Sequence, residues 1–282
     1  MDKQYKMKQV HLIPTAGLCN RMRSIASAVH IAKKLNQSLR IFWNQYEGLN
    51  AKFSDLFQPI PVENTFVEDT QKWKYCINYR KDYLLRRIFL MNYAQVFYNI
   101  SVRNEENIFS KIKNKRGNLL LISCFDMSEM YPLRQIFIPT PEIQGMIDEM
   151  TRQFTSHTVG IHVRRTDNTM SIRESPISCF VEFMEREIEK DAKATFYIAS
   201  DDDEVKEFMR NKFSHRVLFS NIELSRSSLS GMKMAVSELF ALSKTSKILG
   251  SFYSSYSQIA AELGGIPIHY VLQKNKTFKE QK

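Results

Sequence analysis

Two adjacent arginines, Arg164 and Arg165, follow the apolar run Thr158–Val163, and an acid, Asp167, lies two residues further on. The run is typical of a buried strand, and open α/β sheets bind ligands at the carboxyl ends of their strands. Arginine carries a permanent charge and a fork of N–H donors that fits phosphate oxygens. The pair therefore predicts a site for a phosphorylated ligand, although an isolated Arg-Arg-x-Asp is more often a solvated ion pair.

Polar residues recur after three further predicted strands, in Ser200–Asp203, Ser220–Asn221 and Gly250–Ser255. In a doubly wound sheet these junctions open on one rim, so we expect them to line one cleft with the arginines. The serines of the last group lead into a predicted helix, whose free N–H groups favour a phosphate. Serines are equally ordinary helix caps, and that is their more frequent use.

Two acidic features have both a functional and a structural interpretation. The Asp-x-Asp within Asp201–Asp203 can hold magnesium or manganese, but an acidic helix start is the commoner use of such a run. Glu238 lies in an otherwise apolar helix, where a carboxylate costs energy unless it is exposed or paired. A guanine edge, with adjacent N–H donors, is one partner that suits it. The chain has neither G-x-G-x-x-G nor G-x-x-x-x-G-K-[ST], so it lacks the phosphate loops of dinucleotide dehydrogenases and P-loop hydrolases.

Hydrophobic spacing predicts strands and helices that alternate along the chain. The first half begins with a strand at 9–14, a helix at 20–35 and a strand at 38–43, and Asn20 is the expected N-cap of that helix. Gly17, in the intervening turn, permits close ligand approach or a positive φ. Further on we expect a strand at 119–125 and a helix at 142–153. The second half is expected to form strands at 158–163, 194–199, 216–218, 247–249 and 267–271, with helices at 177–190, 203–212, 231–244 and 255–263. This alternation predicts βαβ crossovers and a mostly parallel sheet.

Length and composition predict a two-domain globular protein, with domains at 1–150 and 151–282. The net charge of +10 favours anionic partners. The polar start of the chain and the short longest apolar run, 119–125, predict no signal peptide and no membrane anchor, so we expect a cytoplasmic protein. The four cysteines are far apart, which favours reduced thiols over zinc or a redox pair.

Residues 72–116 mix aromatic and basic side chains, and we expect helices and loops there. Such interleaving can bind nucleic acid or another polyanion, but an amphipathic helical region with a buried aromatic face is the commoner case. We expect no nucleic-acid partner. Contact of these basic residues with a membrane surface remains open.

Taken in order, the motifs resemble the fucosyltransferase superfamily of the GT-B type, especially the α-1,6-fucosyltransferases and the bacterial nodulation fucosyltransferases. His162–Asp167 is similar to the H-x-R-R-x-D signature of that family. The likeness extends through Phe196–Asp202, Glu238–Ser243 and Ser251–Ser255. In the first half, Gly17–Arg21 is similar to the glycine loop of the family.

The resemblance implies an α/β protein with two Rossmann-like lobes, a cleft between them and a doubly wound C-terminal lobe. It implies transfer of fucose from GDP-fucose to a carbohydrate acceptor, with inversion and without a metal ion or other cofactor. Arg164 would hold the β-phosphate with Arg165 supporting it, which stabilises GDP as charge develops on the leaving group. Other implied roles are guanine recognition by His162 and Glu238, donor contacts from Ser251, Ser254, Ser255, Gly17, Asn20 and Arg21, and acceptor-side positions for Asp201 and Asp202.

The chain departs from the family pattern after the signature. The α-1,6 enzymes carry a lysine after the signature aspartate and, several residues on, a glutamate that resembles a general base. Here Asn168 follows, and the position of that glutamate falls near Ile172. Catalysis still needs a group that takes the proton of the acceptor hydroxyl. Glu174 is the first candidate and Asp167 the second, and the α-1,6 linkage does not carry over.

Two alternatives remain open. One is a glycosyltransferase that uses a different GDP-sugar. The other is a non-catalytic protein that binds polyanions or glycans through residues 72–116.

Overall fold

The computed structural model describes residues 7–46, 48–72, 87, 89–101, 108–113, 115–166, 168–220 and 227–273. Residue contacts divide the chain into two compact units. The first comprises Met1–Thr140 and Ser225–Lys233, and the second Pro141–Leu224 and Met234–Lys282. The first unit thus ends at Thr140, whereas the sequence places a boundary at 150.

Helix α6 (Pro141–Thr151) explains that difference, because its side chains contact the second unit. Lys244 Nζ lies 3.2 Å from Asp148 Oδ1, and the Tyr197 hydroxyl lies 3.6 Å from Met150 Sδ. The segment that returns to the first unit is held by Asn50, whose Nδ2 donates to Ser227 O at 2.8 Å.

The first unit is built on a five-stranded parallel sheet in the order β3-β2-β1-β5-β4. The strands are β1 (Met7–Pro14), β2 (Ser38–Asn44), β3 (Thr65–Thr70), β4 (Gln95–Tyr98) and β5 (Gly117–Ser123). The three central strands carry nearly continuous apolar runs, as expected for strands that are covered on both faces.

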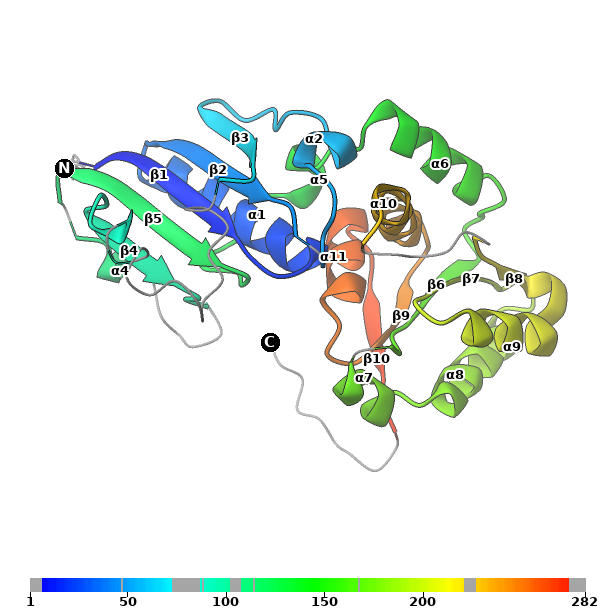
Figure 1. Ribbon diagram of the computed structural model, residues 1–282. Helices are drawn as coiled ribbons and strands as arrows, with labels where there is room; N and C mark the ends of the chain where they lie inside the picture. The colour runs from blue at the N-terminus through cyan, green and yellow to red at the C-terminus, as the bar shows by residue number, and fades with distance from the viewer. Residues whose placement is uncertain are drawn as a thin grey trace. The chain divides into compact units, whose positions relative to one another are not determined.

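Helix α1 (Leu18–Lys34) packs against β1, β2 and β5 and is buried around most of its circumference. On the other face, Phe42 and Leu120 pack with Phe89 in an apolar cluster. Figure 1 shows α1 running alongside the sheet. The shorter helices of this unit are α2 (Phe53–Leu56), α4 (Ile108–Lys111) and α5 (Leu133–Ile136).

The second unit has its own five-stranded parallel sheet, in the order β10-β9-β6-β7-β8. The strands are β6 (Thr158–Val163), β7 (Thr195–Ser200), β8 (Val217–Leu218), β9 (Ile248–Ser251) and β10 (Ile268–Val271). Counted within the unit, this is the doubly wound order 3-2-1-4-5. The order reverses between β6 and β9, which is where such folds bind ligands.

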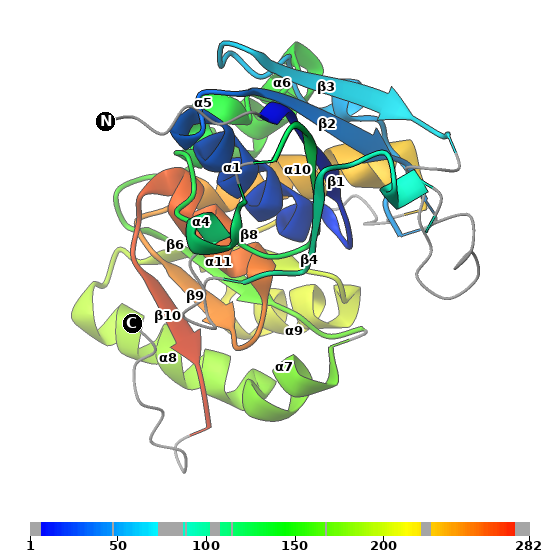
Figure 2. The same ribbon diagram turned by 90° about the vertical axis from the view of Figure 1, so that its left-hand side faces the viewer.

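Helices cover both faces of this sheet, as Figures 1 and 2 show. Helices α8 (Ile177–Lys190) and α9 (Asp203–Phe213) pack on one face through Phe180, Met184 and Met209. Helices α10 (Leu229–Ser243) and α11 (Ser255–Gly264) lie on the other. The short helix α7 (Thr169–Glu174) follows β6, and a 3₁₀ turn at Ser214–Arg216 precedes β8.

The predicted strands and long helices of the second half are all present, with ends shifted by a few residues. The first half is less complete, because the edge strands β3 and β4 were not predicted. The expectation of helices and loops throughout 72–116 is therefore wrong at Gln95–Tyr98, and about half of that region lies outside the described residues.

The turn before α1 also differs from the prediction. Its N-cap is Gly17, and Asn20 lies within the first helical turn. The positive φ is at Ala16 (62°), one residue before the glycine, whose own φ is −71°. The helix starts early enough to bury Leu18 and Cys19.

The described cysteines Cys19, Cys124 and Cys179 are free thiols. None of the helices in the described part of the chain combines the length and apolar character that a bilayer crossing needs.

Two glycines let the helices approach the sheet. A Cβ at Gly250 would lie 2.6 Å from Ser257 Cβ of α11, and a Cβ at Gly160 would lie 2.8 Å from Thr245 Oγ1. Gly250→Ala should therefore lower the free energy of unfolding by about 1–3 kcal/mol, because α11 must shift. Chemical denaturation measures this loss.

The matched control is Gly145→Ala in α6, where a new Cβ would meet nothing within 4 Å. This substitution should be neutral or raise stability by up to about 1 kcal/mol, because alanine favours helix more than glycine does. Equal stability of the Gly250→Ala protein and the unsubstituted protein would contradict the packing described here.

Candidate functional site

The loops that follow β6 and β9 meet where the strand order reverses. His162 of β6 pairs with Gly250 of β9 in the parallel sheet, so the residues that follow the two strands lie side by side. The Arg164 N–H donates to Ser251 Oγ at 2.9 Å, and Ser251 is fully buried. Two of the predicted polar junctions are thus joined directly by a hydrogen bond.

A third junction reaches the same place through Asp201, which follows β7. Its carboxylate accepts the Arg165 N–H at 2.8 Å and the Thr166 hydroxyl at 2.7 Å, and it forms an ion pair with the Arg164 guanidinium. Burial raises the pKa of Asp201, but the Thr166 hydrogen bond and the Arg164 charge outweigh burial and lower it. Asp201 therefore stays ionised and holds the loop after β6. The resemblance had implied an acceptor-side position for it, and its contacts in the structure are with residues 164–166.

The two arginines of the signature have different surroundings. The Arg165 guanidinium donates to Arg164 O at 3.1 Å and to Ser175 O at 2.8 Å, and the residue is only 8% exposed. Arg165 thus supports the loop from within. Arg164 keeps 14% of its side chain exposed and is the member of the pair that borders solvent.

The Ser251–Ser255 loop is fixed by residues of the segment that follows β6. Phe252 N–H donates to Ser175 Oγ at 2.8 Å, and Phe252 O accepts from Ser171 Oγ at 2.7 Å. Ser254 is the N-cap of α11, yet its side chain makes no capping hydrogen bond. Ordinary side-chain capping therefore does not explain Ser254, and the amino end of α11, which starts at Ser255, has an anion-attracting dipole.

His162 lies beneath the loop. Its Nδ1 is 2.7 Å from Ser257 Oγ, and its ring stacks on Tyr256 with the centroids 4.9 Å apart. Burial lowers the pKa of His162 to about 4, so the ring is neutral at physiological pH. In this state the imidazole is packed against Tyr256 and Ser257.

Glu238 has the least satisfied polar group of the predicted site. The residue is 1% exposed, and its Oε1 is buried without a hydrogen-bond partner among the described residues. Burial raises its pKa to about 8, against the opposing charge of Lys206. An orphaned buried carboxyl oxygen is costly and calls for a partner that supplies N–H or O–H donors.

The remaining aspartates match the structural interpretation of the acidic run. Asp202 caps α9 by accepting the Glu204 N–H at 2.9 Å, and Asp203 lies in the first turn. Within the described ranges, no group of three or more His, Cys, Asp or Glu side chains is placed to hold a metal ion.

Of the two base candidates, Glu174 ends helix α7, where 5% of its side chain is exposed and Oε1 accepts from Arg173 Nε at 2.8 Å. Asp167 lies outside the described residues. The Glu174 carboxylate is nearly buried and faces Arg173. Its role as the base therefore stays a prediction.

Three predicted residues, Gly17, Asn20 and Arg21, lie in the first unit. Arg21 is 1% exposed, donates to Ala16 O at 3.0 Å and Asn44 O at 2.7 Å, and stacks over Trp43. It therefore shapes the glycine turn. Gly17 faces open space, and Asn20 is partly exposed beside it.

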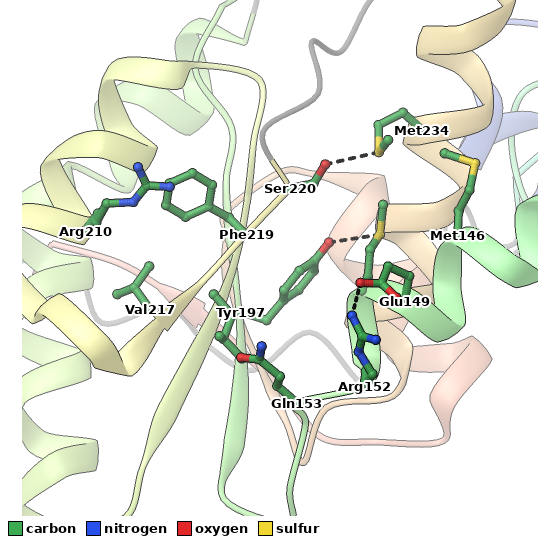
Figure 3. Close-up of a pocket in the computed structure, with 12 residues that line it drawn as sticks. Met146, Glu149, Arg152, Gln153, Tyr197, Arg210, Val217, Phe219, Ser220 and Met234 are labelled. Carbon is green, nitrogen blue, oxygen red and sulfur yellow. Dashed lines mark hydrogen bonds and ion pairs between the residues drawn. The ribbon is translucent and has the colours of Figure 1, made fainter.

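A cavity of about 420 Å³ lies beside the outer strands of the second sheet, between α6 and α10 (Figure 3). Its walls are largely apolar and aromatic and include Met146, Met150, Met234 and Phe219, with Tyr197 at the centre of the view. Met234 lies one helical turn from Glu238, and the charge of Glu238 adds to burial in raising the pKa of Tyr197. Glu238 itself does not line the cavity, but it shares helix α10 with Met234, and its charge reaches Tyr197 in the cavity wall.

Sequence reasoning missed the residues that lock the loops together. Ser175 bonds to Arg165 and Phe252, and Ser257 bonds to His162. Small polar residues near a strand end give only a weak signal, since most of them are turns or caps. Met146 and Met150 line the cavity from one face of α6, four residues apart, and that spacing is equally typical of a helix that packs against a core.

Comparison with known proteins identifies the fold. No protein-family model matches the sequence. No curated protein matches it either. Among solved structures, NodZ alpha-1,6-fucosyltransferase soaked with GDP-fucose matches with a TM-score of 0.63 and 16% identity, over 91% of this chain and 92% of that one. A further match is fucosyltransferase NodZ from Bradyrhizobium, with a TM-score of 0.60 and 15% identity, over 90% and 92% of the two chains.

Other fucosyltransferases also match. FUT1 from Arabidopsis thaliana, in complex with GDP, has a TM-score of 0.61 and 15% identity, over 97% of this chain and 72% of that one. POFUT1 in complex with GDP has a TM-score of 0.55 and 11% identity, over 94% and 98%. These likenesses confirm the predicted α/β fold of GT-B type, with two parallel sheets.

The buried carboxyl of Glu238 makes stability depend on pH. Because its folded-state pKa of about 8 exceeds the ordinary value of 4.5, stabilisation by proton binding is complete below pH 4.5 and is lost as the pH rises through 8. Glu238→Gln, which keeps the shape without the charge, should therefore raise Tm at pH 8.5 by at least about 5 °C.

Thermal unfolding of both proteins between pH 5 and 9 measures this difference, which should narrow toward pH 5. Asp148→Asn is the control, because hydrogen bonds from Gln144 and Lys244 lower the pKa of this exposed carboxyl, so its charge does not change between pH 5 and 9. A Glu238→Gln protein that is less stable than the unsubstituted protein at pH 8.5 would show that the carboxyl is satisfied.

Proposed function

We propose that the protein is an inverting glycosyltransferase that transfers fucose from GDP-fucose to a carbohydrate acceptor without a metal ion. The observation that carries the proposal is the position of Arg164, at the carboxyl end of β6 where the strand order reverses. The fold is that of fucosyltransferases solved with GDP or GDP-fucose, which supports this choice of donor.

The diphosphate is assigned to Arg164 and the amino end of α11. The Arg164 guanidinium already pairs with one anion, the Asp201 carboxylate, at the rim of the sheet. A diphosphate offers more oxygens and more charge than a carboxylate, and the free helix N–H groups and the Ser254 hydroxyl add donors. Arginine at this place would stabilise the negative charge that GDP gains as the glycosidic bond breaks.

The nucleobase is assigned to Glu238. Guanine presents adjacent N–H donors, and a carboxylate accepts both of them, which would satisfy the buried Oε1. The cavity that Tyr197 and Met234 line has a volume in the range of small-molecule sites. Its aromatic and thioether side chains suit a flat ring, and Arg152 and Arg210 add charged donors to its wall. Lys206, whose charge favours the ionised form of Glu238, would assist this binding.

The proposal also assigns roles to residues of the first unit and to a base. Gly17 and Asn20 are assigned to the donor from the first unit, with Arg21 holding their turn. Glu174 is proposed as the base, with Asp167 as the alternative. Acceptor binding must then free Glu174 from Arg173.

Arg164→Ala should weaken GDP binding at least about 30-fold, because the diphosphate loses a charged donor in a partly closed site. Isothermal calorimetry in EDTA measures GDP affinity. Arg186→Ala is the control, because it removes an arginine that pairs with Glu182 on the surface of α8. GDP affinity that survives Arg164→Ala within about threefold would refute the phosphate assignment.

The same titration separates the alternatives. Loss of binding that is steep and linear in log[salt], without selectivity for GDP, would indicate a polyanion-binding protein instead. Hydrolysis assays across GDP-fucose, GDP-mannose and other GDP-sugars identify the donor sugar.

Glu174→Gln should keep GDP affinity within about twofold and lower the rate of transfer by at least about 100-fold, because it removes the proposed proton acceptor. GDP release from GDP-fucose in the presence of an oligosaccharide panel measures the rate. Asp167→Asn is the comparison. Rapid transfer by the Glu174→Gln enzyme and slow transfer by the Asp167→Asn enzyme would move the base to Asp167.

A further inference from the structure

Tyr253 is the most exposed aromatic residue among those described in the second unit. Its exposure is 67%, against 47% for Phe208 and 38% for Tyr270. It stands in the middle of the Ser251–Ser255 loop, whose neighbouring serines are assigned to the diphosphate. Most of this ring is in contact with water, and its centroid lies 6.1 Å from that of the Phe252 ring.

The backbone of Tyr253 is in the left-handed region, with φ of 60°. Bulky residues rarely adopt this conformation, and such strain persists only where the surroundings enforce it. Asn168 Nδ2 donates to Tyr253 O at 3.1 Å, while both backbone groups of the preceding Phe252 are bonded to Ser175 and Ser171. Glycine or asparagine would form this turn at lower cost, so the tyrosine is not explained by the backbone.

The same hydrogen bonds connect Tyr253 to the arginine loop. Ser251, two residues earlier, accepts the Arg164 N–H, and Asn168 follows the signature directly. The exposed Met170 and Ile172 of α7 add apolar surface beside this loop. An aromatic ring is thus held at the rim of the proposed phosphate site.

We propose that Tyr253 is a sugar-binding platform, whose ring packs against the apolar face of the hexose carried by the nucleotide diphosphate. This inference rests on the proposed function. A pyranose has a face of C–H groups that stacks on aromatic rings, and a 6-deoxy sugar adds a methyl group where other hexoses have a hydroxymethyl. The ring therefore contributes to affinity for the sugar and to preference for a deoxy sugar.

Tyr253→Gly tests the contribution of the ring without changing the backbone conformation. Glycine accepts φ of 60° without strain, so this variant keeps the loop and removes only the side chain. Its Tm should equal or exceed that of the unsubstituted protein. Tyr253→Phe keeps the ring and removes the hydroxyl, and Phe208→Ala removes an exposed ring from α9, away from the loop.

Calorimetry with GDP and with GDP-fucose then isolates the contribution of the sugar. In Tyr253→Gly, affinity for GDP should change by less than about threefold, and affinity for GDP-fucose should fall about five- to tenfold. GDP-mannose affinity should fall less, so the preference for fucose shrinks. Tyr253→Phe and Phe208→Ala should match the unsubstituted protein for all three ligands.

Equal affinity of the unsubstituted protein and Tyr253→Gly for GDP-fucose would overturn the platform. Parallel loss of GDP and GDP-fucose affinity would also overturn it, because the residue would then serve the nucleotide. Failure of the unsubstituted protein to bind GDP at all would instead refute the proposed function, so the two failures are distinguishable.

Discussion

One carboxylate, that of Asp201, gathers the donors that hold the proposed phosphate site together. Its two oxygens hold the Arg164 guanidinium, the Arg165 N–H and the Thr166 hydroxyl, which belong to the loop directly after β6. Those donors and the Arg164 charge keep Asp201 ionised although it is partly buried. An arginine that would otherwise be mobile is thereby fixed at the rim before any ligand arrives, which lowers the entropic cost of binding an anion.

The parallel sheet explains why this interaction arises there. Asp201, Arg164 and Ser251 follow β7, β6 and β9, which are neighbours in one sheet, so their carboxyl ends lie at one edge. The reversal of strand order between β6 and β9 leaves room at that edge for a ligand. Arg165 and Ser175 then tie helix α7 to the same point, and the serine loop is tied to α7. The proposed phosphate site is therefore built from three loops that are joined by hydrogen bonds of 2.7 to 2.9 Å.

The sequence predicted the second unit well because its central strand β6 is fully buried and helices such as α8 are amphipathic. The edge strands β3 and β4 are half-exposed and have no regular hydrophobic pattern, so they were not predicted. At the site, the positions of Arg164, Asp201 and Ser251 followed from strand ends. The different roles of Arg164 and Arg165 did not follow from the strand ends. They depend on the backbone carbonyl of Ser175, ten residues further along the chain, which accepts a hydrogen bond from Arg165. Likewise, the position of Glu238 in an apolar helix made it a candidate site residue. Only the packing around it shows that one of its carboxyl oxygens lacks a hydrogen-bond donor.

A crystal structure of the protein with GDP tests the central claim most directly, because it shows which group faces the diphosphate. We expect the Arg164 guanidinium to lie within hydrogen-bond distance of the β-phosphate. Asp201 should still accept hydrogen bonds from the Arg165 N–H and the Thr166 hydroxyl. A diphosphate bound elsewhere, with Arg164 still paired only to Asp201, would contradict it.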